Sequence, residues 1–244
     1  MDLKALKDTP PWDWPAGTVE KLLNVLGDEQ AIESDRLLAT DMAGDCAIVN
    51  DELVATLLAI LGNSEESKQV RARAAISLGP ILEEADTEGL DDAGDVPISK
   101  WTFQGIQGAL HQLYRDAHIP NEVRRRILEA SVRAPREWHE NAVRSAYSSG
   151  DDLWKLPAVF CMRFVRGVNE QIVEELDNKN PDIHLEAALA RRQLGRRSRL
   201  ATHRCAYPVA QNAQAPASGR DWSSAQCSCT GSQRGPELSH RVRR

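Results

Sequence analysis

The chain has few aromatic residues and no long apolar run. Phe, Trp and Tyr make up 5% of its 244 residues, although 41% of the residues are hydrophobic. That hydrophobic fraction can form a sizeable core, and a core with few aromatic rings favours helices packed through Ala and Leu over a β-sandwich. No run of about eighteen apolar residues is present, so we expect no membrane span. The first residues also lack the basic-then-apolar order of a signal peptide, which predicts a cytoplasmic protein.

Motifs that carry catalysis or hold a cofactor are missing as well. The sequence has no glycine-rich phosphate-binding loop and no Ser or Cys nucleophile in a recognisable setting. Its histidines lack a spacing that would join them to Cys or carboxylate groups as metal ligands. Cys46 and Cys161 stand alone, and we expect both to be small buried residues in a reducing compartment. The sequence therefore predicts a protein that is not an enzyme and that needs no cofactor or metal.

One helical pattern is present, and it recurs. Residues 65–82 place four apolar residues three and four positions apart, on one face of a helix: Val70, Ala74, Ala75 and Leu78. The Gly-Pro pair at residues 79–80 predicts the end of that helix, because Gly is common past a helix end and Pro cannot continue one. Further copies are expected at residues 34–44 (with Ser34 in the place of Val70), 121–133, 152–164 and 181–190.

A shorter amphipathic segment precedes each copy. These segments cover residues 19–26, 53–61, 103–114, 142–147 and 171–176. The chain therefore predicts about five helix–turn–helix units over residues 18–190. One such hairpin cannot bury its apolar face alone, so neighbours stack and share a core, and we expect an all-α fold of the α-solenoid class.

One interval between copies is longer than the others, and we attribute it to an acidic loop inserted at residues 83–100. Residues 83–95 contain seven acidic side chains in thirteen positions. They do not fit the ligand register of a helix–loop–helix calcium site, so we interpret them as a solvated surface loop. Ser99 or Thr102 is expected to cap the helix that follows.

A cationic or polar side chain follows the first apolar position in four copies. These residues are Arg71, Arg124, Lys155 and His184. Each lies in the first turn of its helix, where the helix dipole disfavours a positive charge. We therefore expect each to pair with an acidic or amide residue that precedes its helix, and we interpret the pairs as a structural ladder between repeats.

The motif V-R-x-x-A-A-x-x-L-G at residues 70–79 resembles the second helix of a HEAT-like repeat, in particular the short form found in the phycobilisome-lyase group. The resemblance covers roughly residues 18–190. It implies an α-solenoid that binds other macromolecules. Some members of the short-repeat group are lyases or isomerases that attach bilin chromophores to Cys, so an enzyme or accessory protein of that kind is the alternative function.

Residues 1–17 form a Pro- and Trp-rich segment through which we expect no helix to run. A solenoid exposes part of its core at each end unless a cap covers it. We therefore predict that residues 1–17 cap the first repeat, with Trp12 and Trp14 packed on it.

Charge is divided unevenly along the chain. Residues 191–244 contain eleven Arg, no Lys and two acidic residues, whereas the first 190 residues contain 19 basic and 34 acidic residues. An acidic body argues against binding to nucleic acid, which requires clustered Lys and Arg. Low hydrophobicity with a high net charge predicts a disordered tail over residues 191–244.

Three interpretations of this tail stay open. It is a basic segment that binds nucleic acid, or it supplies a zinc site from His203, Cys205, Cys227 and Cys229, although that spacing fits no standard zinc module. The third interpretation explains more of the sequence. The composition changes abruptly within a helical copy, just after Ala190, and the new mixture of Arg, Ala, Ser, Gly and Pro without Lys is what a frameshift in a G/C-rich gene would produce.

These observations predict a non-catalytic scaffold for protein–protein interactions, in which the second helices of the repeats line one broad surface. Six residues of these helices and the turns after them fall off the predicted core face: Arg125, Arg126, Glu129, Arg133, Arg163 and Arg166. They would form a basic strip on an acidic body, suited to an acidic segment of another protein. An ordinary solvated surface is the alternative interpretation.

Overall fold

The structure, a computed structural model, describes residues 3–89 and 97–204, and gives only the backbone of residues 195–204. In these ranges the chain is helical and contains no strand. The helices are α1 (Leu3–Lys7), α2 (Thr18–Gly27), α3 (Glu33–Ala43), α4 (Asp51–Gly62), α5 (Lys68–Glu88), α6 (Lys100–Arg115), α7 (Asn121–Ser131), α8 (Glu137–Tyr147), α9 (Asp152–Cys161), α10 (Asn169–Glu175) and α11 (Pro181–Arg204). A short 3-10 turn covers Pro11–Asp13.

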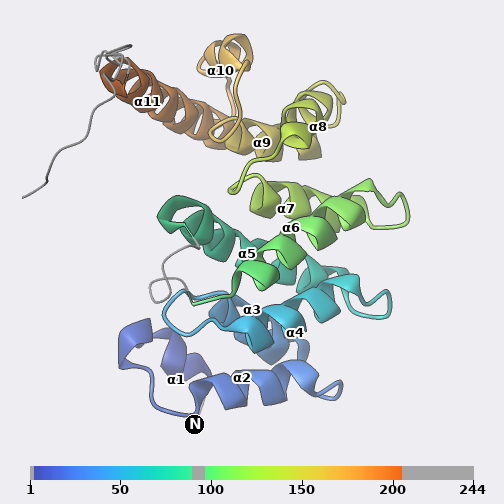
Figure 1. The fold of residues 1–244 in the computed structure, drawn as a ribbon. Coiled ribbons are helices and arrows are strands. Elements are labelled where there is room, and N and C mark those ends of the chain that lie inside the picture. Colours follow the sequence, from blue (N-terminus) through green and yellow to red (C-terminus); the bar gives the residue numbers. More distant parts are fainter. Residues whose placement is uncertain (1–2, 90–96, 205–244) are drawn as a thin grey trace, which may run out of the picture. The chain divides into compact units, whose positions relative to one another are not determined.

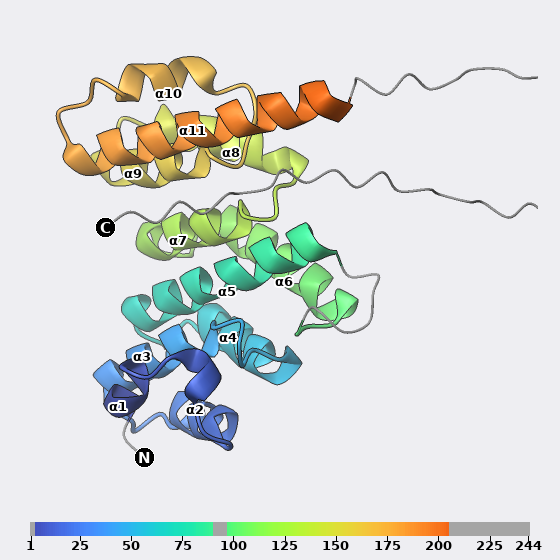
Figure 2. The same cartoon turned by 90° about the vertical axis from the view of Figure 1, so that its left-hand side faces the viewer.

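Five helical hairpins follow one another as a stack (Figure 1). They are α2/α3, α4/α5, α6/α7, α8/α9 and α10/α11. The second helix of each hairpin packs against the second helix of the next, so that α3, α5, α7, α9 and α11 lie side by side in that order. Figure 2 looks onto the side of the molecule that these helices form. The predicted α-solenoid of five hairpins is confirmed.

Side chains just before the helices fix where several of them begin. Asn50 accepts a hydrogen bond from the backbone N–H of Leu53 at the start of α4 (2.8 Å). Ser67 does the same for α5 (3.3 Å), and Ser99 does so for α6 (3.2 Å). Each bond satisfies one of the N–H groups that a helix leaves unpaired in its first turn. The prediction that Ser99 or Thr102 caps α6 is therefore resolved in favour of Ser99.

The two helices of a hairpin are joined by a side chain of the second helix that caps the first. Its nitrogen donates to a backbone carbonyl at the C-terminal end of the preceding helix, where carbonyls lack partners and the dipole favours a cation. The bonds run from Arg36 to Leu26 (3.2 Å), from Arg71 to Leu61 (3.0 Å), from Arg124 to Tyr114 (2.9 Å) and, through Nδ1, from His184 to Leu176 (2.5 Å). We call these four bonds the hairpin clasps.

The clasps correct part of the predicted polar ladder. Arg124 does donate to Asn121 at the start of its own helix, as predicted (3.4 Å). Arg71 and His184 bond to the helix before them and not to the acidic residues that precede their own helices. Lys155 does join neighbouring repeats, through an ion pair with the buried Glu175 (2.8 Å). Arg36 combines both roles, because it also forms an ion pair with Glu66 of the next hairpin (2.5 Å).

The register of the first copy also differs from the prediction. Arg36 makes the same clasp as Arg71, so these two positions are equivalent and Asp35, not Ser34, corresponds to Val70. Ala39 and Ala43, which follow at the core spacing, are fully buried. The polar Thr40 is buried between them because its hydroxyl donates to the carbonyl of Arg36 (2.6 Å).

Helix α5 continues through the Gly-Pro pair at which we predicted its end. Pro80 lies inside the helix, which extends to Glu88, so residues 83–88 of the predicted acidic loop are helical. Ile81, Leu82 and Ala85 are buried beyond the proline, and their burial compensates for the hydrogen bond that proline cannot make. Residues 90–96 of that loop lie outside the described residues.

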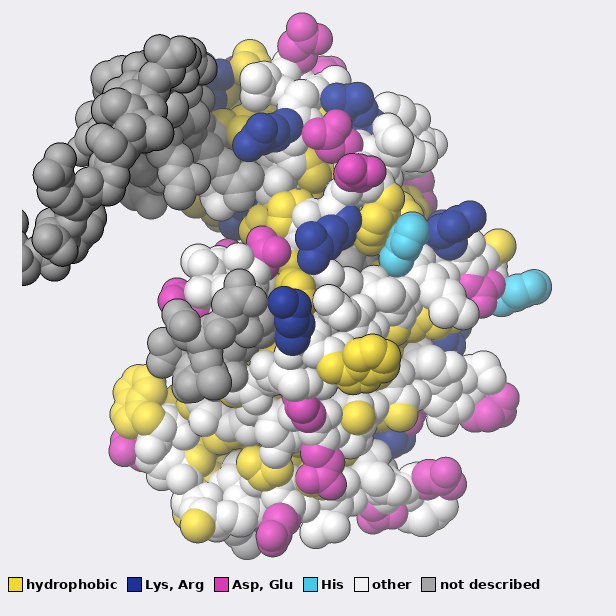
Figure 3. Space-filling model, viewed as in Figure 1, with side chains coloured by type: hydrophobic (Ala, Val, Ile, Leu, Met, Phe, Trp, Pro, Cys, Tyr) yellow, Lys and Arg dark blue, Asp and Glu magenta, His cyan; other side chains and the backbone are white. Residues whose placement is uncertain are grey.

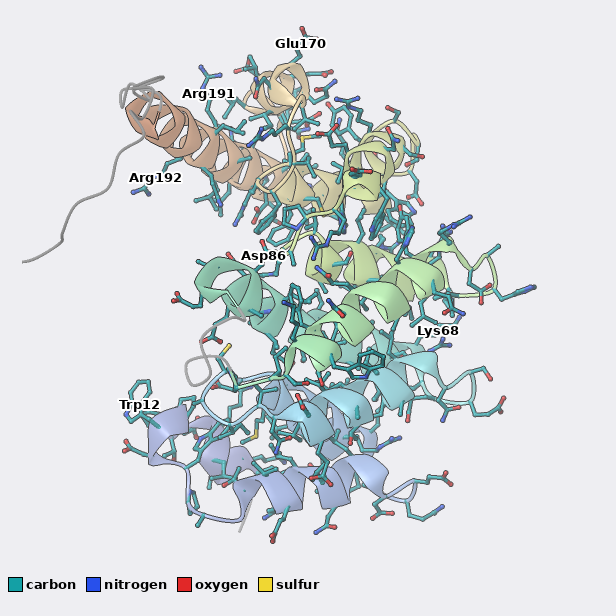
Figure 4. The ribbon with its side chains drawn as sticks, in the orientation of Figure 1. Trp12, Lys68, Asp86, Glu170, Arg191 and Arg192 are labelled. Carbon is teal, nitrogen blue, oxygen red and sulfur yellow. The ribbon has the colours of Figure 1, made fainter. Side chains whose placement is uncertain are left out.

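The N-terminal segment contains a helix, contrary to our prediction. Helix α1 precedes the prolines and packs against α3, with Leu3 and Leu6 buried. Trp14 contributes as predicted, since it packs on the core and its indole N–H donates to the carbonyls of Leu6 (3.0 Å) and Thr9 (2.9 Å). Trp12 does not, because its side chain is 79% exposed and projects away from the helices (Figure 4).

The last helix also extends further than predicted. We expected irregular structure from residue 191, but α11 continues to Arg204. Arg, Gln, Leu and Ala favour helix, and Leu194 packs against buried apolar residues, so the helix continues past Ala190. The rest of the predicted tail, residues 205–244, lies outside the described residues, as do three of the four residues considered for a zinc site. No described helix has both the length and the apolarity needed to cross a bilayer.

The buried apolar residues form two clusters that meet at α7. Ile127 and Ala130 belong to the first cluster, which extends back to α1. Leu128 and Val132 belong to the second, which extends forward to α11. Helix α7 therefore contributes one face to each cluster, and its contact with α9 is the junction between them.

We predict that Gly44→Ala strongly destabilises the stack. A Cβ at Gly44 would lie 2.3 Å from the backbone oxygen of Ser77, so α3 and α5 would have to separate. Overpacking of this kind costs roughly 1–3 kcal/mol in the free energy of unfolding. Gly105→Ala is the control, because the exposed Gly105 in α6 has open space and should gain about 0.5–1 kcal/mol. Equal denaturation midpoints for the two variants would contradict the close approach.

Candidate protein-docking groove

A cavity of about 340 Å³ opens on the face formed by the second helices. Four of these helices and one turn contribute side chains to it: Ile76 from α5; Arg126 and Glu129 from α7, with Arg133 just after it; Leu156 and Phe160 from α9; and Asp182, Leu185 and Glu186 from α11. We call this cavity the groove. It crosses the junction between the two apolar clusters.

The floor of the groove is part of a second apolar face of α9: Leu156 and Phe160 line the groove, and Leu153 continues the face beyond it. Leu153, Leu156 and Phe160 lie at positions i, i+3 and i+7, so they share one side of the helix. The other side of α9, which includes Trp154 and Val159, is buried in the second cluster. Leu153 is 65% exposed. Leu156 and Phe160 are only partly buried against that cluster, so the fold leaves part of this second face open.

One wall of the groove is basic and comes from α7. Arg126 and Arg133 line it, and Arg125 is half-buried on the same helix. Glu129 lies among them, only 7% exposed, and accepts a hydrogen bond from Arg126 (2.6 Å). Burial raises the pKa of Glu129, and the three arginines act against that rise. The carboxylate thus holds the basic wall together but is largely hidden from a ligand.

The opposite wall is acidic and comes from α11. Asp182 and Glu186 are four residues apart and therefore lie on one side of the helix, with Leu185 beside them. Glu186 forms an ion pair with Arg163, which follows the end of α9. Leu185 is 55% exposed and extends the apolar floor onto α11.

Two guanidinium groups hold Phe160 in place. The Arg133 guanidinium lies 5.4 Å from the centre of the Phe160 ring, and that of Arg163 lies 4.9 Å from it. Both distances are within the range of a cation–π interaction. Burial, and then the charge of Arg133, lower the pKa of Arg163. The ring is therefore fixed before any ligand arrives.

Ion pairs connect neighbouring second helices on this face, except across the groove. Asp41 of α3 pairs with Arg73 of α5 (3.1 Å), and Glu83 of α5 pairs with Arg133, which follows α7 (2.5 Å). Between α7 and α9, the described contact is instead the ring of Phe160 beside Arg133. At the groove, an apolar opening therefore lies where an ion pair joins the other neighbouring second helices.

The structure brings together most of the six residues that we selected from the sequence. Arg126, Glu129 and Arg133 line the groove, and Arg163 contacts both its floor and its acidic wall. Arg166 is exposed beyond the end of α9 and is not part of the lining.

Sequence reasoning missed the apolar floor and the acidic wall. The spacing of residues 153, 156 and 160 was the available signal, because it defines a second apolar face on a helix that already has one. The predicted basic strip is therefore only part of the lining. Acidic partners from α5 and α11 neutralise two of its arginines.

The two described cysteines are poor nucleophiles. Burial and a hydrogen bond with Glu84 raise the pKa of the Cys46 thiol to about 12. Cys161 is completely buried, which raises its pKa well above the ordinary value. A thiolate is disfavoured at both positions near neutral pH. Cys46 is half-buried, not fully buried as predicted.

No protein-family model matches the chain, and no curated protein matches its sequence.

We predict that Arg126→Met destabilises the protein at pH 7 by roughly 1–3 kcal/mol, because the buried Glu129 loses its hydrogen-bonded cation. The pKa of Glu129 is already raised in the folded state, so the folded protein binds a proton more readily than the unfolded chain. Losing Arg126 raises this pKa further. The penalty should therefore shrink as the pH is lowered and Glu129 takes up a proton.

The double variant Arg126→Met/Glu129→Gln tests the cause, because it removes the charge that Arg126 compensates. It should recover most of the lost stability at pH 7 in urea denaturation. A penalty that is independent of pH, or that Glu129→Gln does not reduce, would contradict this description of the basic wall.

Proposed function

We propose that the protein is a non-catalytic scaffold of HEAT-like repeats that binds another protein, and that the groove is its docking surface. The observation that carries this proposal is the second apolar face of α9, on which Leu153 is exposed and Leu156 and Phe160 are only partly buried. Exposed apolar surface rimmed by charged residues is typical of protein interaction sites. The groove adds depth to that surface, so a partner can bury side chains in it.

The groove is largely formed before binding. Its floor is fixed by two cation–π contacts, and ion pairs tie its arginines to α5 and α11. Fixed side chains reduce the conformational entropy that a partner must offset on binding. This preorganisation supports a binding role for the surface.

A protein partner fits the charges better than nucleic acid does. Residues 1–89 contain 18 acidic and 7 basic residues, and acidic side chains predominate around α1 to α4 in Figure 3. Such a surface repels a phosphate backbone. The arginines of the groove are engaged with carboxylates, so they do not form the open basic patch that phosphates require. A cytoplasmic location agrees with the two described cysteines, which are free.

We predict that Leu185→Ser abolishes or strongly weakens capture of the partner, whereas Val173→Ser does not. Both residues are exposed apolar side chains, at 55% and 48%, but only Leu185 lines the groove. The measurement compares proteins retained from native extract by the wild-type chain and by each variant, quantified by mass spectrometry. Matched melting temperatures would show that the variants are folded.

The proposal is supported if a protein is retained by the wild-type chain and by Val173→Ser but not by Leu185→Ser. Equal retention by all three chains, or retention that depends only on Val173, would contradict docking in the groove.

A further inference from the structure

We propose that the groove receives an amphipathic helix of the partner protein, with acidic residues on the flank facing α7 and basic residues on the flank facing α11. This inference rests on the proposed function, because it names the chemistry of the segment that docks. It follows from the arrangement of three features: the apolar floor on α9, the basic wall on α7 and the acidic wall on α11.

The apolar face of α9, which includes the floor and continues to Leu153, has the length and periodicity of a helix-binding stripe. Leu153 and Phe160 are seven residues apart, which corresponds to about 10 Å along a helix axis. A partner helix presents apolar anchors at i, i+3 or i+4, and i+7 over the same distance. Ile76 and Leu185 widen the floor on either side, so a helix lying along α9 would bury its apolar stripe against three helices of the solenoid.

The two walls carry opposite charges. On the α7 side, Arg126 and Arg133 line the groove, and the charge of Arg125 also acts on Glu129. These three cations meet two carboxylates, the buried Glu129 and Glu83, which pairs with Arg133. On the α11 side, Asp182 and Glu186 face one cation, Arg163, which is also mostly buried. A docked helix therefore meets a net positive wall on one flank and a net negative wall on the other.

This polarity selects among partner helices. A helix with one acidic and one basic flank can pair with both walls. It must lie along α9 in the direction that sets its acidic flank against α7 and its basic flank against α11. A helix whose flanks are both acidic pairs with α7 but is repelled by Asp182 and Glu186. A helix whose flanks are both basic pairs with α11 but is repelled by the arginines of the α7 wall. Like charges at an interface reduce affinity and exclude wrong partners.

Three model peptides test the inference. Each is a hydrocarbon-stapled helix of about 18 residues with the same Leu stripe at i, i+4 and i+7, and the flanks are Glu/Lys, Glu/Glu or Lys/Lys. Binding to the full-length wild-type protein is measured by fluorescence anisotropy. We expect the Glu/Lys peptide to bind about tenfold more tightly than either of the others, because each of those meets one repulsive wall.

Three protein variants test the charge pattern and the floor. Arg125→Glu weakens the basic wall, so the Lys/Lys peptide should gain affinity and the Glu/Lys peptide should lose it. Arg115→Glu, an equal charge change on the exposed end of α6, should leave the ranking unchanged. Leu185→Ser should weaken all three peptides, because it removes part of the shared floor.

Tightest binding by the Glu/Glu or Lys/Lys peptide, equal binding of all three, or no binding by any of them would overturn the inference. Its failure is distinct from a failure of the proposed function. If capture from extract still depends on Leu185 while the peptides rank differently, the groove binds a protein but not a helix of this charge pattern. If capture does not depend on Leu185, the docking surface itself is refuted.

Discussion

The structure depends on a cation, or a histidine, that closes four of the five hairpins. In four of the five hairpins the second helix sends a side chain to a carbonyl at the end of the first. Each bond satisfies an orphan acceptor and places a donor at the negative end of a helix dipole. Arg71 is almost completely buried while it does so, which fixes α4 and α5 at one spacing. Neighbouring hairpins can then stack with a common register.

That register also determines which charged residues meet on the opposite edge of the second helices. Because equivalent positions align from one hairpin to the next, charged residues on this face can pair across α3/α5, α5/α7 and α9/α11. Only the α7/α9 junction, where the two apolar clusters meet, places an aromatic ring and leucines there instead. The groove is thus a local exception to a regular pattern, and such exceptions are where a binding function is expected.

The sequence predicted the hairpins because apolar spacing of three and four residues survives in every second helix. It failed where packing overrides local signals, as at Pro80, and where a helix is too short to show a period, as at α1. The groove was only half predicted. Arg126 and Arg133 were found as charges off the core face, but Leu156 and Phe160 were not, because apolar residues on a helix are first assigned to the core. The acidic partners Glu83 and Glu186 come from other repeats, and no local pattern places them beside these arginines.

The most direct test of this architecture is amide hydrogen exchange, followed by mass spectrometry, on an Arg71→Met variant. Methionine keeps the apolar bulk of the side chain but cannot donate to the carbonyl of Leu61. We expect faster exchange at the end of α4 and the start of α5, with α9 and the start of α11 unchanged, because repeats contact only their neighbours. Unchanged exchange in α4 and α5, or an equal increase in every hairpin, would contradict the role of the clasp.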